Sequence, residues 1–531
     1  MAERSGIPVW QEVGATPAPA AGESRLPLLI VGAGPVGLTL ALDLARKGHR
    51  VVVLNRLDFI AAGSKGICYA KRTLDIWNRL GVGETMLGKG VVWNVGKVFW
   101  GADPAPIYQF DMLPVKDQQM PGFINLQQYY VEQFLVAALA SLPNVDIRWG
   151  HELVAMSQDD DGVVADIECA GQRYRLRTDW LLACDGHRSR VRELMQLDFE
   201  GRIFEDNFLI ADIKMHGERP SERWFWFDPP FNPGQSALLH KQPDDVWRLD
   251  FQLGWNIDRE ACTRPERVEP LVRGMLGSQV QFTREWYSVY TFQCRRMARF
   301  VHGRVLFVGD SAHLVSPFGA RGANGGIADV DNLAWKLDLI LRGGAAALLL
   351  ESYNYEATVT ADENIRNSTR STDFLTPKSA ASRSLRDAVL GLARDYEFAR
   401  PWVNSGRLST AVSYPLSALN TPDEAGASWQ GVAPGSPALD APWDGEWLLG
   451  KLGERFVLLT NGWRGELPPG IARLDIADAA GDAQLIGDRY DLSPGSASLI
   501  RPDQYVAARW RKPDTKRIAR AWQTATGGRC E

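Results

Sequence analysis

Cysteine is scarce in this chain, and the spacing of the few cysteines excludes two common uses of the residue. The 531 residues include six cysteines, and none stands in a C-x-x-C pair or at the spacing of a zinc site. Scattered thiols of this kind favour a reducing compartment. We therefore expect a cytoplasmic protein that holds no metal.

The chain also lacks long apolar runs and blocks of positive charge. It has no stretch of 18 apolar residues, and its net charge is −5 with both signs intermixed. These features argue against a membrane-spanning helix and against nucleic-acid binding. Residues 1–24 are rich in Ala, Pro and Gly but lack the basic start and apolar core of a signal peptide. We expect this segment to be a flexible N-terminal arm.

The most informative motif is a glycine turn between a predicted strand and a predicted helix. The apolar run Leu28–Val31 meets Gly32, Gly34, Pro35 and Gly37 in G-x-G-x-x-G order, and an Ala/Leu-rich helix and a second apolar run follow. This is the context that a dinucleotide fingerprint needs: the three glycines permit the turn, the approach of a pyrophosphate and close helix–strand packing. The phosphates would lie on the free N–H groups at the helix N-terminus.

The end of the second apolar run departs from the usual fingerprint. An acidic residue commonly stands there to hold the ribose hydroxyls. This chain has Asn55 followed by Arg56, and Asn offers a hydrogen bond without charge. The fingerprint alone therefore leaves NAD, NADP and FAD open.

Two further motifs follow predicted strands. Residues 180–195 read WLLACDGHRSRVRELM and place Asp185 after a strand. Residues 304–326 read RVLFVGDSAHLVSPFGARGANGG and place Gly309 and Asp310 after another. Because ligands of open α/β sheets bind at the carboxyl ends of the strands, we expect all three motifs to meet at one crevice.

The remaining chain divides by pattern. Pro, Ser, Gly and Ala dominate residues 406–445, which predicts a linker. A new alternation from residue 447 predicts a separate small α/β domain. Four β-rich stretches separated by turn residues predict an antiparallel sheet: 207–215, 223–228, 235–241 and 246–253.

Taken together, the three motifs resemble those of single-component FAD-dependent aromatic hydroxylases, the p-hydroxybenzoate hydroxylase and phenol hydroxylase group. GAGPVG is similar to the family's GxGxxG, CDGHRS to its DG motif and GDSAH to its GD motif, in the same order. The tail LIRPDQYVAARW resembles the thioredoxin-like domain of the phenol hydroxylase branch. The resemblance implies an α/β Rossmann-like FAD-binding domain, an inserted antiparallel-sheet substrate domain (α+β) and a thioredoxin-like C-terminal domain.

The resemblance and the composition shifts together give domain boundaries. We expect a flexible arm (1–24), a FAD-binding domain (25–92, 124–200 and 296–345), a substrate-binding domain (93–123 and 201–295), a helical segment (346–405), a linker (406–445) and a thioredoxin-like domain (446–531). The last domain lacks a C-x-x-C pair, so a packing or dimer role is expected of it, and we expect a homodimer.

The resemblance also assigns FAD-binding residues by their position in the motifs. Lys65 stands where many members have Arg, and Gln128 begins a Q-x-x-x-E motif with Glu132. The N–H groups of Ala323 and Asn324 would stabilise negative charge on the reduced flavin. The full implied set is Gly32, Gly34, Pro35, Gly37, Asn55, Arg56, Lys65, Gln128, Asp185, Gly309, Asp310, Gly322, Ala323 and Asn324.

The reaction that the resemblance implies is hydroxylation of a phenolic or hydroxybenzoate-type ring. NADH or NADPH would reduce FAD, and O2 would give a flavin C4a-hydroperoxide that transfers one oxygen atom. Pro317 would line the hydroxylation pocket. His240 is a candidate for a contact to the phenol or a proton relay, with a structural role as the alternative, and His313 is interpreted as structural.

Further substrate contacts are expected from the predicted antiparallel sheet. Because alternate residues of a strand share a face, Trp224 and Trp226 should lie together and Arg248 should oppose Trp247. Core packing is the alternative role for the tryptophans, and a surface salt bridge is the alternative for the arginine. The candidate substrate contacts are Trp93, Trp224, Trp226, Trp247 and Arg248.

Two other functions remain open at this point. WFWFDP at 224–229 is near the W-x-W-x-I-P strand of flavin-dependent halogenases, with Asp228 in place of Ile. A non-catalytic flavin-binding scaffold is the second alternative. Oxidation of NAD(P)H by the isolated protein would favour the hydroxylase, whereas a need for supplied reduced flavin and halide would favour the halogenase.

Overall fold

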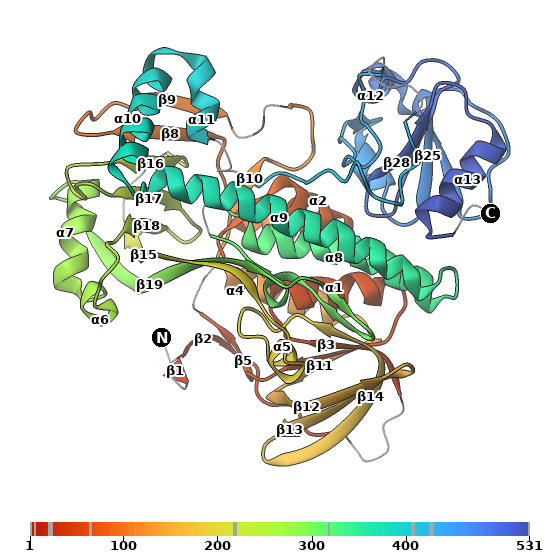
Figure 1. The fold of residues 1–531 in the computed structure, drawn as a ribbon, viewed down its shortest axis with the longest axis horizontal. Helices are drawn as coiled ribbons and strands as arrows, with labels where there is room; N and C mark the ends of the chain where they lie inside the picture. Colours follow the sequence, from red (N-terminus) through yellow and green to blue (C-terminus); the bar gives the residue numbers. More distant parts are fainter. Residues whose placement is uncertain are drawn as a thin grey trace.

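The computed structural model describes residues 3–4, 7–19, 25–62, 66–111, 113, 115–215, 220–316, 319–404, 409–423 and 429–528. Lys65 and Pro317, two of the predicted site residues, lie outside this part of the chain. Figure 1 shows two large sheets, the long helices α8 (Gly322–Leu341) and α9 (Leu350–Leu375) running across the molecule, and a smaller C-terminal unit. In the ranges described, no helix is long and apolar enough to cross a membrane.

The first large sheet carries the glycine turn. Strands β11, β4, β3, β14 and β21 run parallel, and β4, β3, β21 and the last residues of β14 are apolar and buried, as expected when helices cover both faces. Its strands are β11 (Val145–Trp149), β4 (Val51–Asn55), β3 (Leu26–Val31), β14 (Gln172–Ala183), β13 (Gly162–Cys169), β12 (His151–Asp159), β21 (Val305–Phe307) and β20 (Val301–His302). The helices packed nearby are α1 (Pro35–Arg46), α2 (Lys71–Arg79), α3 (Gly83–Lys89), α4 (Gln128–Leu139) and α5 (Arg190–Leu194).

The second large sheet is antiparallel except for one parallel pair, β16 with β8. In spatial order its strands are β22 (His313–Leu314), β19 (Phe282–Arg296), β15 (Glu200–Met215), β18 (Val246–Gln252), β17 (Ser236–Lys241), β16 (Arg223–Phe227), β8 (Val95–Trp100) and β9 (Tyr108–Asp111). Helices α6 (Arg259–Cys262) and α7 (Pro265–Leu276), together with the hairpin of α10 (Ala380–Asp395), η3 (Glu397–Ala399) and α11 (Arg400–Asn404), pack around it. Strands from 93–123 and 201–295 thus share one sheet, which supports the proposed substrate domain.

A small three-stranded sheet lies between the two large ones. It is formed by β6 (Cys68–Ala70), β10 (Phe123–Asn125) and β7 (Val91–Val92). Because β6 leads directly into α2, this sheet connects the nucleotide-binding half of the chain with the second large sheet.

The C-terminal unit has a mixed four-stranded sheet in the order β26 (Ile471–Asp475), β25 (Phe456–Thr460), β27 (Ala497–Ile500) and β28 (Val506–Trp510). β25 and β26 are parallel, and β27 is antiparallel to both of its neighbours. Helices α12 (Ala483–Tyr490) and α13 (Thr515–Ala525) pack on it. The thioredoxin-like assignment stays a prediction, which the strand order supports; residues 461–470 join β25 to β26 without a helix.

Residues 7–19 of the predicted N-terminal arm are packed rather than flexible. β2 (Ile7–Glu12) pairs with β5 (Phe59–Ala61), and the Trp10 ring stacks on Tyr129 with the centroids 4.0 Å apart. The backbone N–H of Gly14 donates to the Asp58 carbonyl at 2.8 Å. Strand pairing and aromatic packing therefore hold residues 7–19 against the first domain.

The predicted linker is also largely part of a folded unit. Trp429 and Trp443 are 4% and 5% exposed within the core of the C-terminal unit. The backbone N–H of Gly435 donates to the Val506 carbonyl at 2.7 Å. Residues 429–445 are therefore packed structure, and their Pro and Gly content reflects turns rather than a loose connection.

A buried ionic cluster joins the C-terminal unit to α8 and α9. Glu356 lies 2.7 Å from Arg501 and 2.8 Å from Lys336, and all three side chains are fully buried. Burial alone would raise the pKa of Glu356, but the two cations outweigh it and lower that pKa. Burial lowers the pKa of Lys336 to about 8. Trp335 of α8 adds a 3.0 Å hydrogen bond to Asp503, so the C-terminal unit is bonded to the C-terminal half of α8.

Candidate active site

The three sequence motifs meet at one edge of the first sheet. Val31, Ala183 and Phe307 are in register across the parallel strands β3, β14 and β21. The residues that follow, among them Asp185 and Gly309, therefore leave the sheet at the same carboxyl edge. The expected convergence is confirmed, and a crevice at this edge is where α/β sheets bind nucleotides.

The glycine turn after β3 is built for close approach. Gly32 has φ = +109°, and a Cβ there would lie 2.4 Å from the Cys184 carbonyl oxygen. A Cβ on Gly37 would lie 2.0 Å from the Gly32 oxygen, whereas one on Gly34 would meet nothing within 4 Å. The open space at Gly34 adjoins the N-terminus of α1, which begins at Pro35 without a side-chain cap. This arrangement fits a pyrophosphate on uncapped N–H groups.

The GD motif is packed between α1 and α8. The Gly309 N–H donates to Asp329 Oδ2 at 3.0 Å, and His313 Nε2 lies 2.6 Å from the same oxygen. Burial disfavours the charged ring, but the Asp329 carboxylate outweighs it and raises the pKa of His313. The structural role expected for His313 fits this contact. A Cβ on Gly326 would lie 2.6 Å from Val36, so α8 and the first glycine motif nearly touch.

The N-terminus of α8 is held in place by one amide side chain. Asn324 Oδ1 accepts from the Ala70 N–H at 2.8 Å and from Thr73 Oγ1 at 2.6 Å, and its Nδ2 donates to the Cys68 carbonyl at 3.0 Å. The side chain thus ties the helix start to β6 and α2. The first N–H groups of any helix lack intrahelical partners, so those of Gly322 onward present a positive helix end to an anionic group.

Asp185 carries a buried oxygen that lacks a partner. Its Oδ2 accepts from the Val191 N–H at 3.0 Å, while Oδ1 is buried and unbonded among the described residues. Burial raises the pKa of this carboxyl group. An orphaned acceptor at the same edge as the open Gly34 turn fits a ligand rich in hydroxyl groups, such as FAD.

Two other predicted FAD residues bond to the protein itself. Asn55 Oδ1 accepts from the Ala33 N–H at 3.4 Å, and its Nδ2 donates to the Leu57 carbonyl at 3.0 Å. Gln128 Oε1 accepts from the Gly66 N–H at 3.2 Å. Arg56 is exposed at the end of β4, and Asp310 lies in the turn Gly309–Ser311. These residues flank the edge, and their contacts with FAD stay a prediction.

The candidate substrate residues divide between the two faces of the second sheet. We call the inner face the one formed by Arg223, Phe225, Leu238, His240, Arg248 and Asp250, and the outer face the one formed by Trp224, Trp226, Leu239, Trp247 and Leu249. Trp93, His240 and Arg248 lie on or against the inner face, while Trp224, Trp226 and Trp247 belong to the outer face. The structure therefore does not bring the six predicted residues together.

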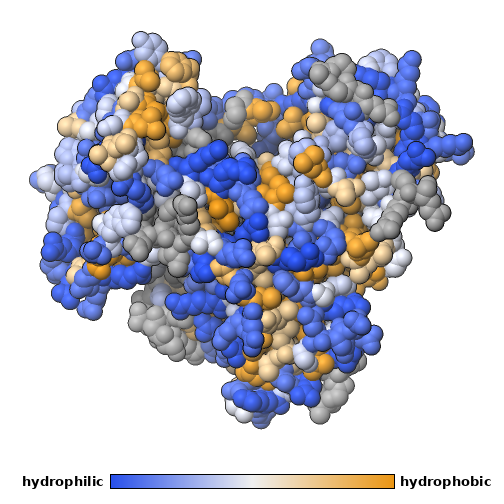
Figure 2. All heavy atoms as spheres, in the orientation of Figure 1, coloured by the Kyte–Doolittle hydropathy of each residue, from blue (hydrophilic) through white to orange (hydrophobic). Residues whose placement is uncertain are grey.

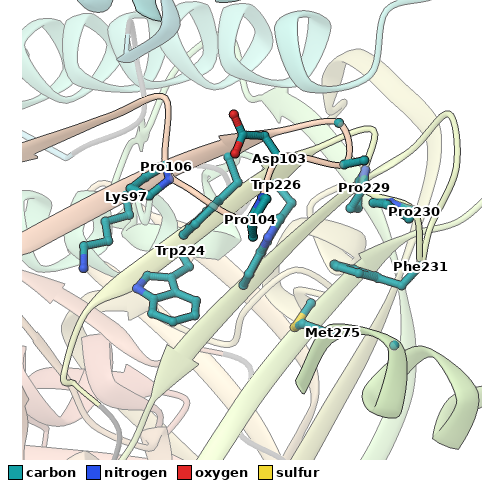
Figure 3. A pocket seen from close by; sticks show the side chains of 14 residues that line it. Lys97, Asp103, Pro104, Pro106, Trp224, Trp226, Pro229, Pro230, Phe231 and Met275 are labelled. Atoms are coloured by element: carbon teal, nitrogen blue, oxygen red, sulfur yellow. The ribbon is translucent and has the colours of Figure 1, made fainter. Parts of the chain in front are cut away.

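The outer face borders a cleft away from the first sheet. This half-open cleft of about 520 Å³ is lined by aromatic and proline side chains, and Figure 3 shows Trp224 and Trp226 beside Phe231 and Met275. Trp226 stacks on Phe99 with the centroids 5.0 Å apart. Helix α7 packs against the rest of this face.

The inner face contacts the small sheet, which is hydrogen-bonded to the start of α8. Cys68, whose carbonyl binds Asn324, has its sulfur 4.0 Å from His240 Nδ1. Asn125 Oδ1 accepts from Trp93 Nε1 at 3.1 Å, and its Nδ2 donates to the Lys241 carbonyl at 2.8 Å. One residue thus separates the start of α8 from the polar groups of the inner face.

Sequence reasoning missed Arg223, Asp212 and Cys68. Arg248 is not a surface residue: it forms a buried two-point ion pair with Asp212, at 2.8 and 2.7 Å. Burial, followed by the charge of Arg223, lowers the pKa of His240 to about 4, so its ring is neutral at neutral pH. Strand alternation could have placed Arg223 on the face opposite Trp224, but it shows neither that Arg223 lies beside His240 nor which face meets the cofactor.

Comparison with known proteins identifies the nucleotide-binding half. The chain is 31% identical to a 3-(3-hydroxy-phenyl)propionate/3-hydroxycinnamic acid hydroxylase of Shigella sonnei over 367 residues, 68% of this chain and 64% of that protein. A solved p-nitrophenol 4-monooxygenase from Pseudomonas putida superposes with a TM-score of 0.65 at 25% identity, over 73% of this chain and all of that one.

The complete fold also has a solved counterpart. The flavin-dependent monooxygenase PieE, determined with FAD and substrate, has a TM-score of 0.77 at 23% identity and covers 96% of this chain and 99% of its own. The expected fold class, an α/β FAD-binding fold with additional domains, is confirmed. A family model described as "FAD binding domain" matches residues 25–368, which include all three motifs. The chain therefore belongs to the FAD-binding domain family.

Proposed function

We propose that this protein is an FAD-dependent monooxygenase that hydroxylates a phenolic or hydroxybenzoate-type ring, with NADH or NADPH as reductant and O2 as co-substrate. The relative from Shigella sonnei is named as a hydroxylase of phenolic acids, and the solved relative from Pseudomonas putida as a monooxygenase of p-nitrophenol. FAD supplies the redox chemistry of this reaction: acceptance of hydride and activation of O2 for transfer of one oxygen atom.

The chain's own residues would bind FAD and orient the phenol. The Gly32–Gly37 turn and α1 would hold the pyrophosphate, and Asp185 would accept from a ligand hydroxyl. The α8 N-terminus would stabilise negative charge on the flavin ring because its first N–H groups point outward from the helix. Neutral His240 would contact the phenol from the inner face.

One observation carries the proposal more than any other. Cys68 bonds through its carbonyl to Asn324 at the start of α8 and approaches His240 of the inner face through its sulfur. The start of α8, at the carboxyl edge of the first sheet where FAD would bind (the FAD edge), therefore lies beside a buried polar surface, as ring hydroxylation next to a flavin requires.

The test is turnover by the isolated holoprotein. We expect a panel of phenols and hydroxybenzoates to include at least one compound that stimulates NAD(P)H oxidation and gains one oxygen atom from isotopically labelled O2. Stimulated oxidation that yields only hydrogen peroxide, with no labelled product from any compound, would contradict the proposal.

The halogenase alternative finds less support. Its sequence signal is the pair Trp224 and Trp226, and both rings point to the outer face. A halogenated product formed only with supplied reduced flavin and halide would favour it over hydroxylation.

We also propose that the protein forms a homodimer through the hairpin of α10, η3 and α11. Figure 2 shows apolar side chains gathered over this hairpin. They are Leu385, Leu392, Tyr396, Phe398 and Trp402, each between 43% and 66% exposed. Exposed apolar patches of this kind mark partner surfaces.

Light scattering tests this dimer. The double variant Phe398→Ser/Trp402→Ser should be monomeric, and Leu416→Ser, at an 82% exposed leucine elsewhere, should not change the mass. A monomeric parent protein would contradict the proposal.

A cytoplasmic location also stays our proposal, supported by the free thiols of the five described cysteines.

A further inference from the structure

Three basic side chains stand in a row across the inner face. His240 of β17 pairs in register with Arg248 of β18, and Trp224 pairs with Leu239, so Arg223 of β16 comes next to His240. All three are buried, with exposed fractions of 4% or less. A buried positive charge is costly unless an acceptor meets it.

Only one of the two arginines, Arg248, forms an ion pair with a carboxylate of the described chain. Arg248 is satisfied by Asp212 through two parallel hydrogen bonds, and the carboxylate outweighs burial and raises its pKa. Arg223 has no such partner: among the described residues, no carboxylate forms an ion pair with it. The pKa of Arg223 is lowered, chiefly by burial.

The surroundings of Arg223 leave its donors available. Its Nη1 lies 3.8 Å from the Cys68 sulfur, a weak acceptor, and its Nε is buried without a partner. The guanidinium carbon lies 5.4 Å from the centroid of the Trp93 ring and 5.0 Å from that of the Phe225 ring. Aromatic faces hold a planar cation in position but do not replace a hydrogen-bond acceptor.

The position of Arg223 relative to the FAD edge is also fixed. Cys68, which it contacts, accepts a hydrogen bond from Asn324 at the start of α8. Trp93 and Phe123 pack 5.5 Å apart beside the same residues. A small molecule that meets Arg223 with an acidic group can therefore place an attached aromatic ring next to the flavin site.

We propose that Arg223 binds the carboxylate of the substrate, and that the enzyme therefore acts on phenolic acids rather than on neutral phenols. The inference rests on the proposed hydroxylase function and adds the substrate class to it. A carboxylate suits this position because it accepts two parallel N–H bonds from one guanidinium. Arg248, the arginine that the sequence suggested as a substrate contact, already makes these two bonds to Asp212.

Ligand binding to the FAD-loaded enzyme tests the proposal without turnover. The probes are 3-(3-hydroxyphenyl)propionate, 3-hydroxyphenylacetate and 3-hydroxybenzoate, each compared with its carboxamide, and the readout is the change in flavin absorption. We expect at least one acid to bind the parent enzyme at least 30-fold more tightly than its amide. Arg223→Met should reduce this ratio to below about 3-fold, and Arg223→Lys should retain part of it.

Thermal unfolding of the ligand-free holoenzyme separates a binding role from a structural one. Because no carboxylate among the described residues pairs with Arg223, Arg223→Met should keep its FAD and unfold at or above the parent's midpoint, while Arg248→Met should unfold below it. An undiminished acid preference in Arg223→Met, no acid preference in the parent, or loss of FAD from Arg223→Met would each overturn the proposal. If acids bind preferentially and no phenol is hydroxylated, the hydroxylase function fails and the carboxylate site stands.

Discussion

The inner and outer faces of the second sheet share the same strands but have opposite chemistry. On β16, Arg223 points inward and Trp224 outward; on β18, Arg248 points inward and Trp247 outward. The inner face holds buried charges that contact Cys68, which bonds to the start of α8, and the outer face holds aromatic rings against α7. The comparison shows that the role of each side chain depends on which element covers its face, and not on residue type alone.

Among the variants that test this comparison, Arg248→Met should lower the free energy of unfolding the most. Removing the arginine leaves Asp212 as an unpaired buried carboxylate, and breaking such a pair costs about 3–5 kcal/mol. Denaturant unfolding measures the loss, with Arg223→Met as the matched control on the same face. A loss below about 1 kcal/mol would show that the pair is not buried in the way we describe.

The pH dependence of His240 should come next. Its pKa is about 4 in the folded protein and about 6.5 unfolded, so the unfolded chain binds the extra proton between these values. Stability should therefore fall as the pH drops from 6.5 towards 4, by on the order of 2–3 kcal/mol from this residue. His240→Gln, measured by unfolding across that range, should lose this part of the slope; an unchanged slope would contradict the assignment.

Trp226→Ala tests the outer face. The ring stacks on Phe99 and meets Phe231 edge-on at 5.8 Å, but it is only partly buried, so we expect a loss of about 1–2 kcal/mol. The ring points away from the FAD edge. We therefore expect kcat and KM each to stay within about twofold of the parent values. A tenfold fall in kcat/KM would indicate that the substrate binds at the outer face, which would contradict our account.

Lys97→Met should have the smallest effect. Lys97 pairs with Glu222 at 2.8 Å on the rim of the outer cleft, and both side chains are partly exposed. Pairs of this kind contribute about 0–1 kcal/mol and weaken with salt. Thermal unfolding at low and high salt measures this loss of stability. A loss above about 1 kcal/mol would indicate that the Lys97–Glu222 pair is buried, which would contradict the contrast between a charged inner face and an exposed outer rim.

The nucleotide-binding half was predictable because its signals are local. The Gly32 turn and the strand before Asp185 each combine an apolar run with residues that permit a tight backbone, and parallel strands bring such ends to one edge. The same local reading failed for residues 7–19 and 429–445. Their Pro and Gly content predicts loose chain, whereas strand pairing with β5 and the burial of Trp429 depend on partners far away in sequence.

The inner face could be predicted only in part. Alternation correctly grouped Trp224 with Trp226 and opposed Arg248 to Trp247, as the register confirms. It did not show that Asp212 neutralises Arg248, because β15 meets β18 only in the folded sheet. Arg223 escaped notice for the same reason: its distinguishing property is a missing carboxylate, which no sequence pattern displays.

A crystal structure of the FAD-loaded protein with a bound phenolic acid would test the central claim most directly. We predict that the ring lies between the N-terminus of α8 and the inner face, with the carboxylate on Arg223. A ring bound instead in the outer cleft, between Trp224 and Trp226, would contradict this account.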